Sequence, residues 1–241
     1  MKTPPAQLAR YVGAAVVAVL LATTVAGPRR DVDSLDTIVE GGVARQVDFA
    51  GQNLARDDLS RQNLADANFT GARLTGTDLS QAVLTDADFT NADLNRAVLR
   101  GVNAVGASFQ FADLDDAEIV RGDFSQADFT NADLEDAVMV GASFVSARLV
   151  AADLHRVVAD DAVFRKALLT NADLRQARLT RADFRGADLT NVDLERAILV
   201  GANLSGAVLD GADLRRAELE DVIFDTTTRW PAGFDPASVT R

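Results

Sequence analysis

The stretch TNADL at residues 90–94 decides the fold. It recurs unchanged at 130–134 and 170–174, and as TNVDL at 190–194. The gaps are 40, 40 and 20 residues, so the stretch returns only at multiples of twenty. A helix repeats its apolar residues about every 3.6 positions and a strand every second position, so neither explains this spacing. Strict repetition at a fixed period indicates a solenoid, in which each unit buries its apolar residue against neighbouring units.

A shorter period of five underlies the period of twenty. From Phe49 to Phe224, every fifth residue is apolar, and 32 of these 36 central residues are Leu or Phe. The others are Ile119, Met139, Ala104 and Ala159. Ala occupies the position two residues earlier in 26 of the 36 units. Phe recurs in rows spaced by twenty, at 49–129 and at 124–184, which indicates that four five-residue sides form one coil and that like residues stack.

Units such as ADFTN (87–91), ADLNR (92–96) and ADLRQ (172–176) follow the motif A-(D/N)-L-X-X. With them, residues 47–224 resemble the pentapeptide-repeat family. The resemblance implies an all-β fold, a right-handed quadrilateral β-helix of about nine coils, with the central residue and the preceding Ala facing inward. Nine coils at about 4.8 Å each give a rod ~40 Å long. Asn91 and its equivalents at 131, 171 and 191 occupy a turn position, where Asn and Gly tolerate the positive φ of tight turns.

The ends of the chain depart from the repeat. Residues 11–27 carry no charge and follow Lys2 and Arg10. As a helix they would span ~26 Å, close to the thickness of a bilayer core. We therefore expect one N-terminal hydrophobic helix within residues 1–30, either a cleaved signal peptide or a single transmembrane anchor. Residues 31–46 are interpreted as a linker or N-terminal cap.

Residues 225–241 form the expected C-terminal cap. Their sequence TRWPAGFDP (228–236) resembles a tail common in the pentapeptide-repeat family. Trp230 and Phe234 are expected to cover the last coil. The N-terminal segment favours a membrane-anchored or exported protein with an extracytoplasmic repeat domain, although an anchor facing the cytoplasm stays open.

The composition excludes several classes of site. There is no Cys, and His155 is the only His, so thiolate and multi-His metal sites are absent. The net charge of −12 disfavours direct nucleic-acid binding, because phosphate contacts need Lys and Arg. His155 follows an inward residue and is expected to be exposed. No phosphate-binding Gly loop or catalytic grouping stands out, so we expect no enzyme, no cofactor and no metal.

Two outward surfaces are candidate partner-binding sites. The first is a ladder of carboxylates at steps of twenty, with about 4.8 Å between rungs. Its members are Asp93, Asp113, Asp133, Asp153, Asp173, Asp193 and Asp213. Like charges at such a spacing repel by about 1 kcal/mol in water. The ladder is either a mimic of the DNA backbone or simply the usual family residue, partly neutralised by neighbouring Arg side chains.

The second candidate is an apolar stripe on the side that carries Ile119 and Met139. It consists of Val98, Val120, Val138, Val140, Val158, Ile198 and Val200. A contiguous exposed apolar surface marks an interface, whereas the alternative is the ordinary preference of Val for strands. The stripe is expected to bind a second copy, another envelope protein or the membrane surface.

These patterns predict a non-enzymatic scaffold for protein interaction that is membrane-tethered or exported. The protein partner is not identified by the sequence, and a homodimer is one option. The alternative function comes from the family resemblance, because some pentapeptide-repeat proteins are implicated as acidic DNA mimics that bind DNA gyrase. The two differ in compartment, since a gyrase ligand must be cytoplasmic.

Overall fold

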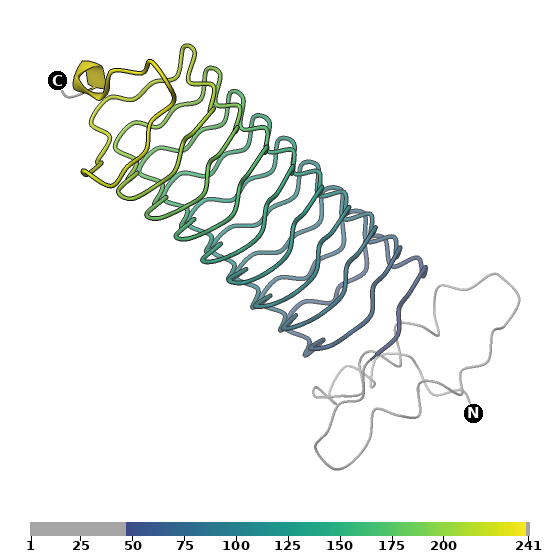
Figure 1. Ribbon diagram of the computed structural model, residues 1–241. Coiled ribbons are helices and arrows are strands. Elements are labelled where there is room, and N and C mark those ends of the chain that lie inside the picture. Colours follow the sequence, from purple (N-terminus) through teal and green to yellow (C-terminus); the bar gives the residue numbers. More distant parts are fainter. Residues whose placement is uncertain (1–46, 240–241) are drawn as a thin grey trace, which may run out of the picture. The chain divides into compact units, whose positions relative to one another are not determined.

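The computed structural model describes residues 47–239, with side chains described as far as residue 237 (Figure 1). The chain divides into two units, 1–47 and 48–241, and the second unit contains the repeats. The predicted hydrophobic helix, signal or anchor segment and the 31–46 linker lie outside the described residues. Within the part of the chain that the structure describes, no helix is sufficiently long and apolar to span a bilayer.

The part of the chain that contains the repeats is a solenoid whose coils stack in parallel along one axis (Figure 1). Parallel bridges join each residue before a central residue to its equivalent twenty positions later, from Asp48↔Asn68 to Asn203↔Ile223. Only the last bridge, Val208↔Arg229, departs from this spacing. Four bridges per coil confirm the predicted four-sided β-helix. We number the sides by their central residues: face 1 contains Phe49, face 2 Leu54, face 3 Leu59 and face 4 Leu64, each repeating every twenty residues.

Each five-residue unit bonds to the coils on both sides. In the unit centred on Phe69, the Phe69 N–H donates to the Asp88 carbonyl at 2.7 Å and the Gly71 N–H donates to Thr90 at 2.9 Å. The unit then turns, because the Ala72 N–H bonds back to the Phe69 carbonyl at 2.9 Å. Bridges therefore alternate with turns, and the described residues contain isolated bridges rather than continuous strands.

The core consists of the central residues and the Ala that precede them. Both sets are buried along most of the solenoid. On face 1, the rings from Phe49 to Phe129 stack with centroids 4.6–4.9 Å apart. On face 4, those from Phe124 to Phe184 stack at 4.9–5.4 Å. Edge contacts such as Phe109–Phe124 at 5.8 Å join the two columns. The predicted stacking of like on like is confirmed.

Every corner of the described coils, from Gly51 to Asp221, has positive φ. Asn91 (58°) and Asn171 (61°) confirm the turn predicted for this position. Most corners carry neither Asn nor Gly, because the five-residue register imposes the conformation whatever the side chain. Phe111 is the clearest misfit, since it has a φ of 57° and is 54% exposed.

The C-terminal segment packs on the last coil. The Trp230 ring meets Phe224 edge-on at 5.3 Å and stacks on Phe234 at 4.7 Å. The 3₁₀ helix η3 (Pro236–Val239) follows and is the only helix among the described residues. These aromatic contacts shield the apolar end of the solenoid from water.

Candidate protein-interaction faces

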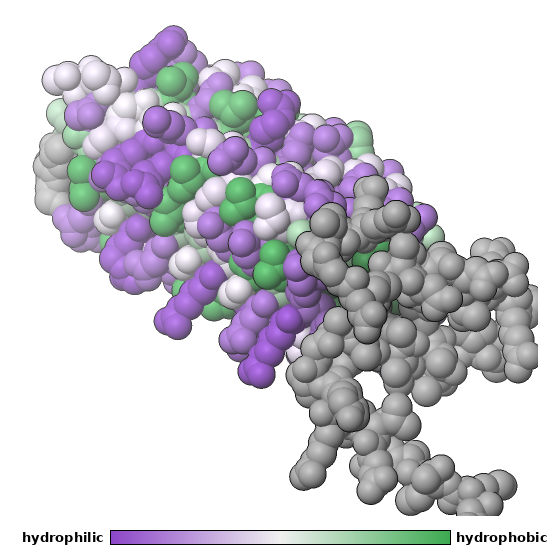
Figure 2. Space-filling view, turned by 90° about the horizontal axis from the view of Figure 1, so that it is seen from below, coloured by the Kyte–Doolittle hydropathy of each residue, from purple (hydrophilic) through white to green (hydrophobic). Residues whose placement is uncertain are grey.

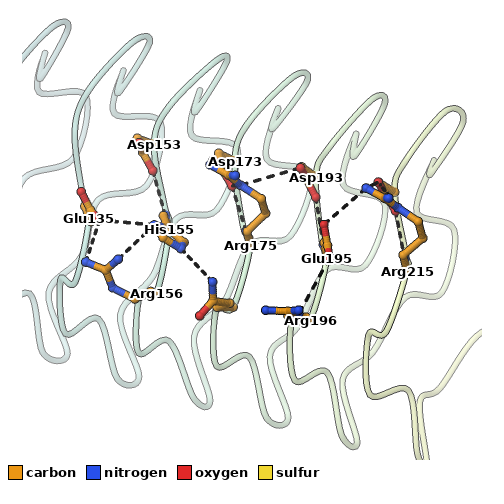
Figure 3. A network of polar contacts seen from close by, with 12 residues as sticks. Glu135, Asp153, His155, Arg156, Asp173, Arg175, Asp193, Glu195, Arg196 and Arg215 are labelled. Carbon is orange, nitrogen blue, oxygen red and sulfur yellow. Dashed lines mark hydrogen bonds and ion pairs between the residues drawn. The ribbon is translucent and has the colours of Figure 1, made fainter.

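The predicted Asp ladder lies on face 2, in the position before each central Leu. Parallel bridges pair its members in sequence, from Asp93↔Asp113 to Asp193↔Asp213. Figure 3 shows Asp153, Asp173 and Asp193 on successive coils, with other charged residues alongside. The structure therefore brings all seven carboxylates onto one face.

Each ladder carboxylate has a structural partner in its own unit. Its Oδ1 accepts the backbone N–H of the residue two positions later, as in Asp153 to His155 at 2.9 Å and Asp133 to Glu135 at 3.0 Å. The same bond is present at Asp93, Asp113, Asp173, Asp193 and Asp213. Such Asx turns stabilise the tight corner. This local bond explains the Asp column without a ligand.

Toward the C-terminal end of face 2, Arg side chains neutralise Asp173 and Asp213, whereas burial raises the pKa of Asp153, which has no ion pair among the described residues. Arg175 bonds both carboxylate oxygens of Asp173, and Arg215 binds Asp213 and also reaches Glu195 at 3.3 Å (Figure 3). The hydrogen bond from Arg215 holds the pKa of Asp213 below its usual value. Burial raises the pKa of Asp173, but the Arg175 and backbone hydrogen bonds outweigh it, so this pKa also falls.

The N-terminal half of face 2 is more acidic. Around Asp115 lie Asp113, Asp116 and Asp133, and only Asp116 among these four forms an ion pair within the described residues, with Arg96 at 3.2 Å. Burial, followed by repulsion from the three neighbouring carboxylates, raises the pKa of Asp115. The carboxylates of Asp113, Asp115 and Asp133 therefore form a local region of uncompensated negative charge.

Three carboxylates in this region, Asp115, Asp116 and Asp136, have oxygens within 4.8 Å of one another. Two of them already bind cations of the chain, because Arg96 pairs with Asp116 and Arg156 bonds both oxygens of Asp136. The Arg156 hydrogen bond lowers the pKa of Asp136. The grouping lacks the six to eight oxygens of a Ca²⁺ site, and it is explained by its own ion pairs.

His155 is less exposed than the sequence indicated, since only 18% of its side chain is accessible. Its Nδ1 lies 3.2 Å from Glu135 Oε1, and its Nε2 lies 3.2 Å from Gln176 Nε2 (Figure 3). The expectation of an exposed His was wrong because side chains on adjacent coils cover the ring. No nucleophile is in contact with it among the described residues, so His155 is part of the polar network.

The apolar stripe lies on face 3. Its members are half-buried, flanking the central residues on both sides: Val98, Val138, Val158 and Ile198 precede them, while Val120, Val140 and Val200 follow them. Val138 and Val158 are bridged directly, whereas Glu118 separates Val98 from Val138. The stripe is thus densest between the coils of Leu99 and Ala159. On the side seen in Figure 2, hydrophobic residues likewise form small patches among hydrophilic ones.

Two ion pairs lie along the stripe, one inside its dense part and one at its C-terminal edge. Arg100 pairs with Glu118 inside the dense part, and Arg178 pairs with Asp160 at 2.6 Å at the edge. The sequence analysis missed these charged residues because it selected face 3 by its Val alone. It also missed exposed Phe111, which the corner pattern could have identified, since this bulky side chain occupies a column otherwise rich in Asn and Gly.

Comparison with known proteins agrees with this architecture. The model of pentapeptide repeats matches residues 45–81, 82–118, 123–158, 160–196 and 187–225. None of the curated proteins matches the chain. Among solved structures, HetL, a pentapeptide repeat protein involved in heterocyst differentiation regulation from the cyanobacterium Nostoc sp. strain PCC 7120, is 30% identical. The match covers 74% of this chain and 89% of HetL, with a TM-score of 0.40.

Two further solved structures are similar. A second Nostoc pentapeptide repeat protein, alr5209, is 37% identical over 40% of this chain and 80% of that protein, with a TM-score of 0.40. QnrB1, a plasmid-mediated fluoroquinolone resistance protein, is 17% identical over 76% of this chain and 92% of that one, also with a TM-score of 0.40. Because the family model covers most of residues 45–225, the chain belongs to the pentapeptide-repeat family, whose members form right-handed quadrilateral β-helices.

Proposed function

We propose that this protein is a non-enzymatic scaffold whose outward faces bind other proteins. The observation that supports the proposal is the difference between face 2 and face 3, which have the same regular backbone. The ladder carboxylates of face 2 bond to backbone N–H groups of the chain, whereas face 3 presents half-buried Val side chains between charged residues. An apolar centre with a polar rim is typical of a protein interface.

The experiment that tests this proposal is site-directed photo-crosslinking in the source cells. A photoreactive amino acid replaces Val140 on face 3, and Val145 on face 4 is the matched control, because both follow a central residue and are half-buried. We expect protein adducts at Val140 that are absent or much weaker at Val145. Equal labelling at both positions, or no adduct at either, would contradict a face-specific interaction.

We further propose that residues 1–30 tether the repeat domain to a membrane or direct its export. The basis is the uncharged run at 11–27 between basic residues. Protease treatment of intact and lysed cells carrying a C-terminally tagged copy tests this location, and the mass of the tagged product shows whether the segment is cleaved. Protection until the inner membrane is lysed would place the domain in the cytoplasm.

The second candidate function is binding of DNA gyrase by mimicry of the DNA backbone. The uncompensated carboxylates around Asp115 favour it, since they form a local negative surface. A supercoiling assay with purified gyrase tests it. The mimicry predicts inhibition or protection by the wild type that is lost when Asp113 and Asp133 are both changed to Asn. No effect of the wild type would exclude this function.

A further inference from the structure

We propose that face 3 binds face 3 of a second copy, with the two solenoids antiparallel and the two-fold axis between the coils of Ile119 and Met139. The inference rests on the proposed interaction function and names the partner of the same apolar stripe. It is carried by the order of apolar and charged residues along the face. A two-fold contact of this kind is isologous, so the same patch must complement itself.

The geometry of such a pair fixes which residues meet. The proposed two-fold axis lies in the plane of the interface and runs perpendicular to the long axis of the solenoid. Each column of residues on one face then lies opposite the same column of the second copy, in reverse order. With the axis between Ile119 and Met139, Val98 opposes the partner's Val158. In the column after the central residues, Val120 opposes the partner's Val140. In the column before them, Glu118 opposes the partner's Val138, with the Glu118 carboxylate held by Arg100 of its own chain. The axis therefore places Val on Val in two of these three opposed pairs.

Charged residues along the stripe also complement one another in the same register. Arg100 opposes the partner's Asp160, and Asp78 opposes the partner's Arg178. Within one chain, Arg100 already pairs with Glu118, and Arg178 with Asp160. The contact would join these pairs into a network of alternating charge alongside the Val side chains. Such networks contribute more than isolated surface pairs and strongly select the register.

Neighbouring registers lose the contact between Arg100 and the partner's Asp160. If the axis passed through the coil of Met139, Val120 would oppose the partner's Asp160 and Val98 the partner's Arg178. If it lay between Met139 and Ala159, Val140 would oppose the partner's Asp160. Each shift also sets Asp160, which pairs with Arg178 of its own chain, against Val. The second shift sets Glu118 opposite the partner's Arg178. It leaves Arg100, however, opposite the partner's Val200, and charges placed against Val carry a desolvation cost.

Face 2 does not pair with itself in this way. On this face, the residue before the central Leu is Asp in all seven coils from Asp93 to Asp213. The antiparallel arrangement would place Asp opposite Asp along the whole contact, and like charges face to face disfavour association. Face 3 therefore differs from face 2 in having an apolar centre and charges of both signs.

Charge exchange between two variants tests the inference. Arg100→Glu alone would oppose Glu to the partner's Asp160, and Asp160→Arg alone would oppose Arg to the partner's Arg100. We expect sedimentation velocity to show a concentration-dependent dimer for the wild type and monomer for each variant. An equimolar mixture of the two variants should regain the dimer mass, because both opposing pairs are then of opposite sign.

The matched control is Arg165→Glu on face 4. Arg165 reaches an acidic residue eighteen positions later, Asp183 at 3.7 Å, as Arg100 reaches Glu118. This variant should keep the wild-type mass. A misfolded variant cannot produce the recovery expected in the mixture, so the mixing result also separates lost folding from lost contact. A wild type that stays monomeric at all concentrations, or a mixture that stays monomeric, would overturn the inference.

The outcome also separates this inference from the proposed function. Suppose that the purified wild type is monomeric but that the photoreactive residue at position 140 captures a different protein in cells. The second copy is then excluded as the occupant of face 3, while the scaffold function stands. A monomeric protein with no adduct at position 140 contradicts both.

Discussion

Face 2 and face 3 share one backbone and one buried core, but their outward side chains differ in how they interact with the rest of the chain. On face 2, the Asp carboxylates bond backbone N–H groups, and in the C-terminal half they also bond Arg175 and Arg215. On face 3, the Val side chains cover part of the sheet and remain half-buried. A conspicuous charged column can therefore serve the fold, and the less conspicuous apolar column is the one that we propose for binding.

The largest expected effect on stability comes from Asp173 on face 2. Asp173→Ala removes the bond to the Arg175 backbone N–H and the contacts with the Arg175 guanidinium. We expect a loss of about 1–3 kcal/mol in the free energy of unfolding, since hydrogen bonds to charged groups contribute more than neutral ones. Chemical denaturation measures it. The comparison on face 3 is Val140→Lys, which should change stability by less than about 0.5 kcal/mol.

Substitutions at Asp133 separate its backbone bond from its charge. Asp133→Asn keeps an oxygen that can accept the Glu135 N–H and removes one charge beside Asp113 and Asp115. Its free energy of unfolding should equal or exceed that of the wild type. Asp133→Ala should cost about 1 kcal/mol, because the backbone N–H loses its partner. If Asn is as damaging as Ala, the structural explanation of the ladder is wrong.

Asp213 and Asp115 on face 2 should respond oppositely to pH. The pKa of Asp213 is lowered by the Arg215 hydrogen bond, so its contribution to stability is present above the ordinary carboxyl pKa and is lost as the pH falls. The pKa of Asp115 is raised by burial and repulsion, so the folded state loses stability as the pH rises through that pKa.

The corresponding variants make this contrast measurable. Arg215→Gln should lower the free energy of unfolding at pH 7, whereas Asp115→Asn should raise it. Both differences should shrink in strong acid, where Asp213 and Asp115 are protonated in the folded and unfolded states alike. Denaturation curves across the acid range test this. Parallel pH profiles for the two variants would contradict the contrast between Asp213 and Asp115.

The smallest effect is expected at Phe111, on the corner beside the acidic half of face 2. Phe111→Asn should stabilise the protein by up to about 1 kcal/mol, because left-handed backbone is costly for bulky residues and Asn adopts it more readily. Asn91 and Asn131 have a φ of 58° on the adjacent coils. Phe111→Leu is the control, since Leu gains no such advantage. A Tm equal to that of the wild type in both variants would remove the backbone explanation.

The fold could be predicted almost entirely from the sequence. The period of five gives the length of one side of the β-helix, and the period of twenty gives the length of one coil. The stacked rings of Phe69 and Phe89 follow from spacing alone. The positive φ at corners such as Phe111 could not be predicted from residue preference, because the repeat register overrides it. The partial burial of His155 was also missed, since it depends on side chains from adjacent coils.

The candidate faces were predicted less completely. The sequence gathers the Asp ladder and the Val stripe in columns, but the partners of each side chain depend on rotamers and on the neighbouring coils. The bond from each Asp to the backbone N–H two residues later and the pairs Arg100–Glu118 and Arg178–Asp160 emerged only with the structure. These contacts distinguish a stabilising column from the surface that we propose binds a partner.

The most direct test of the account is the mass of the purified repeat-containing protein in solution, compared among wild type, Val140→Lys and Val145→Lys by sedimentation velocity. Val140 and Val145 are equivalent in the repeat and similar in exposure, and differ only in the face that carries them. The account predicts a dimer for the wild type and Val145→Lys, and a monomer for Val140→Lys with unchanged thermal stability. A mass that Val140→Lys leaves unchanged would contradict the assignment of face 3 as the interface.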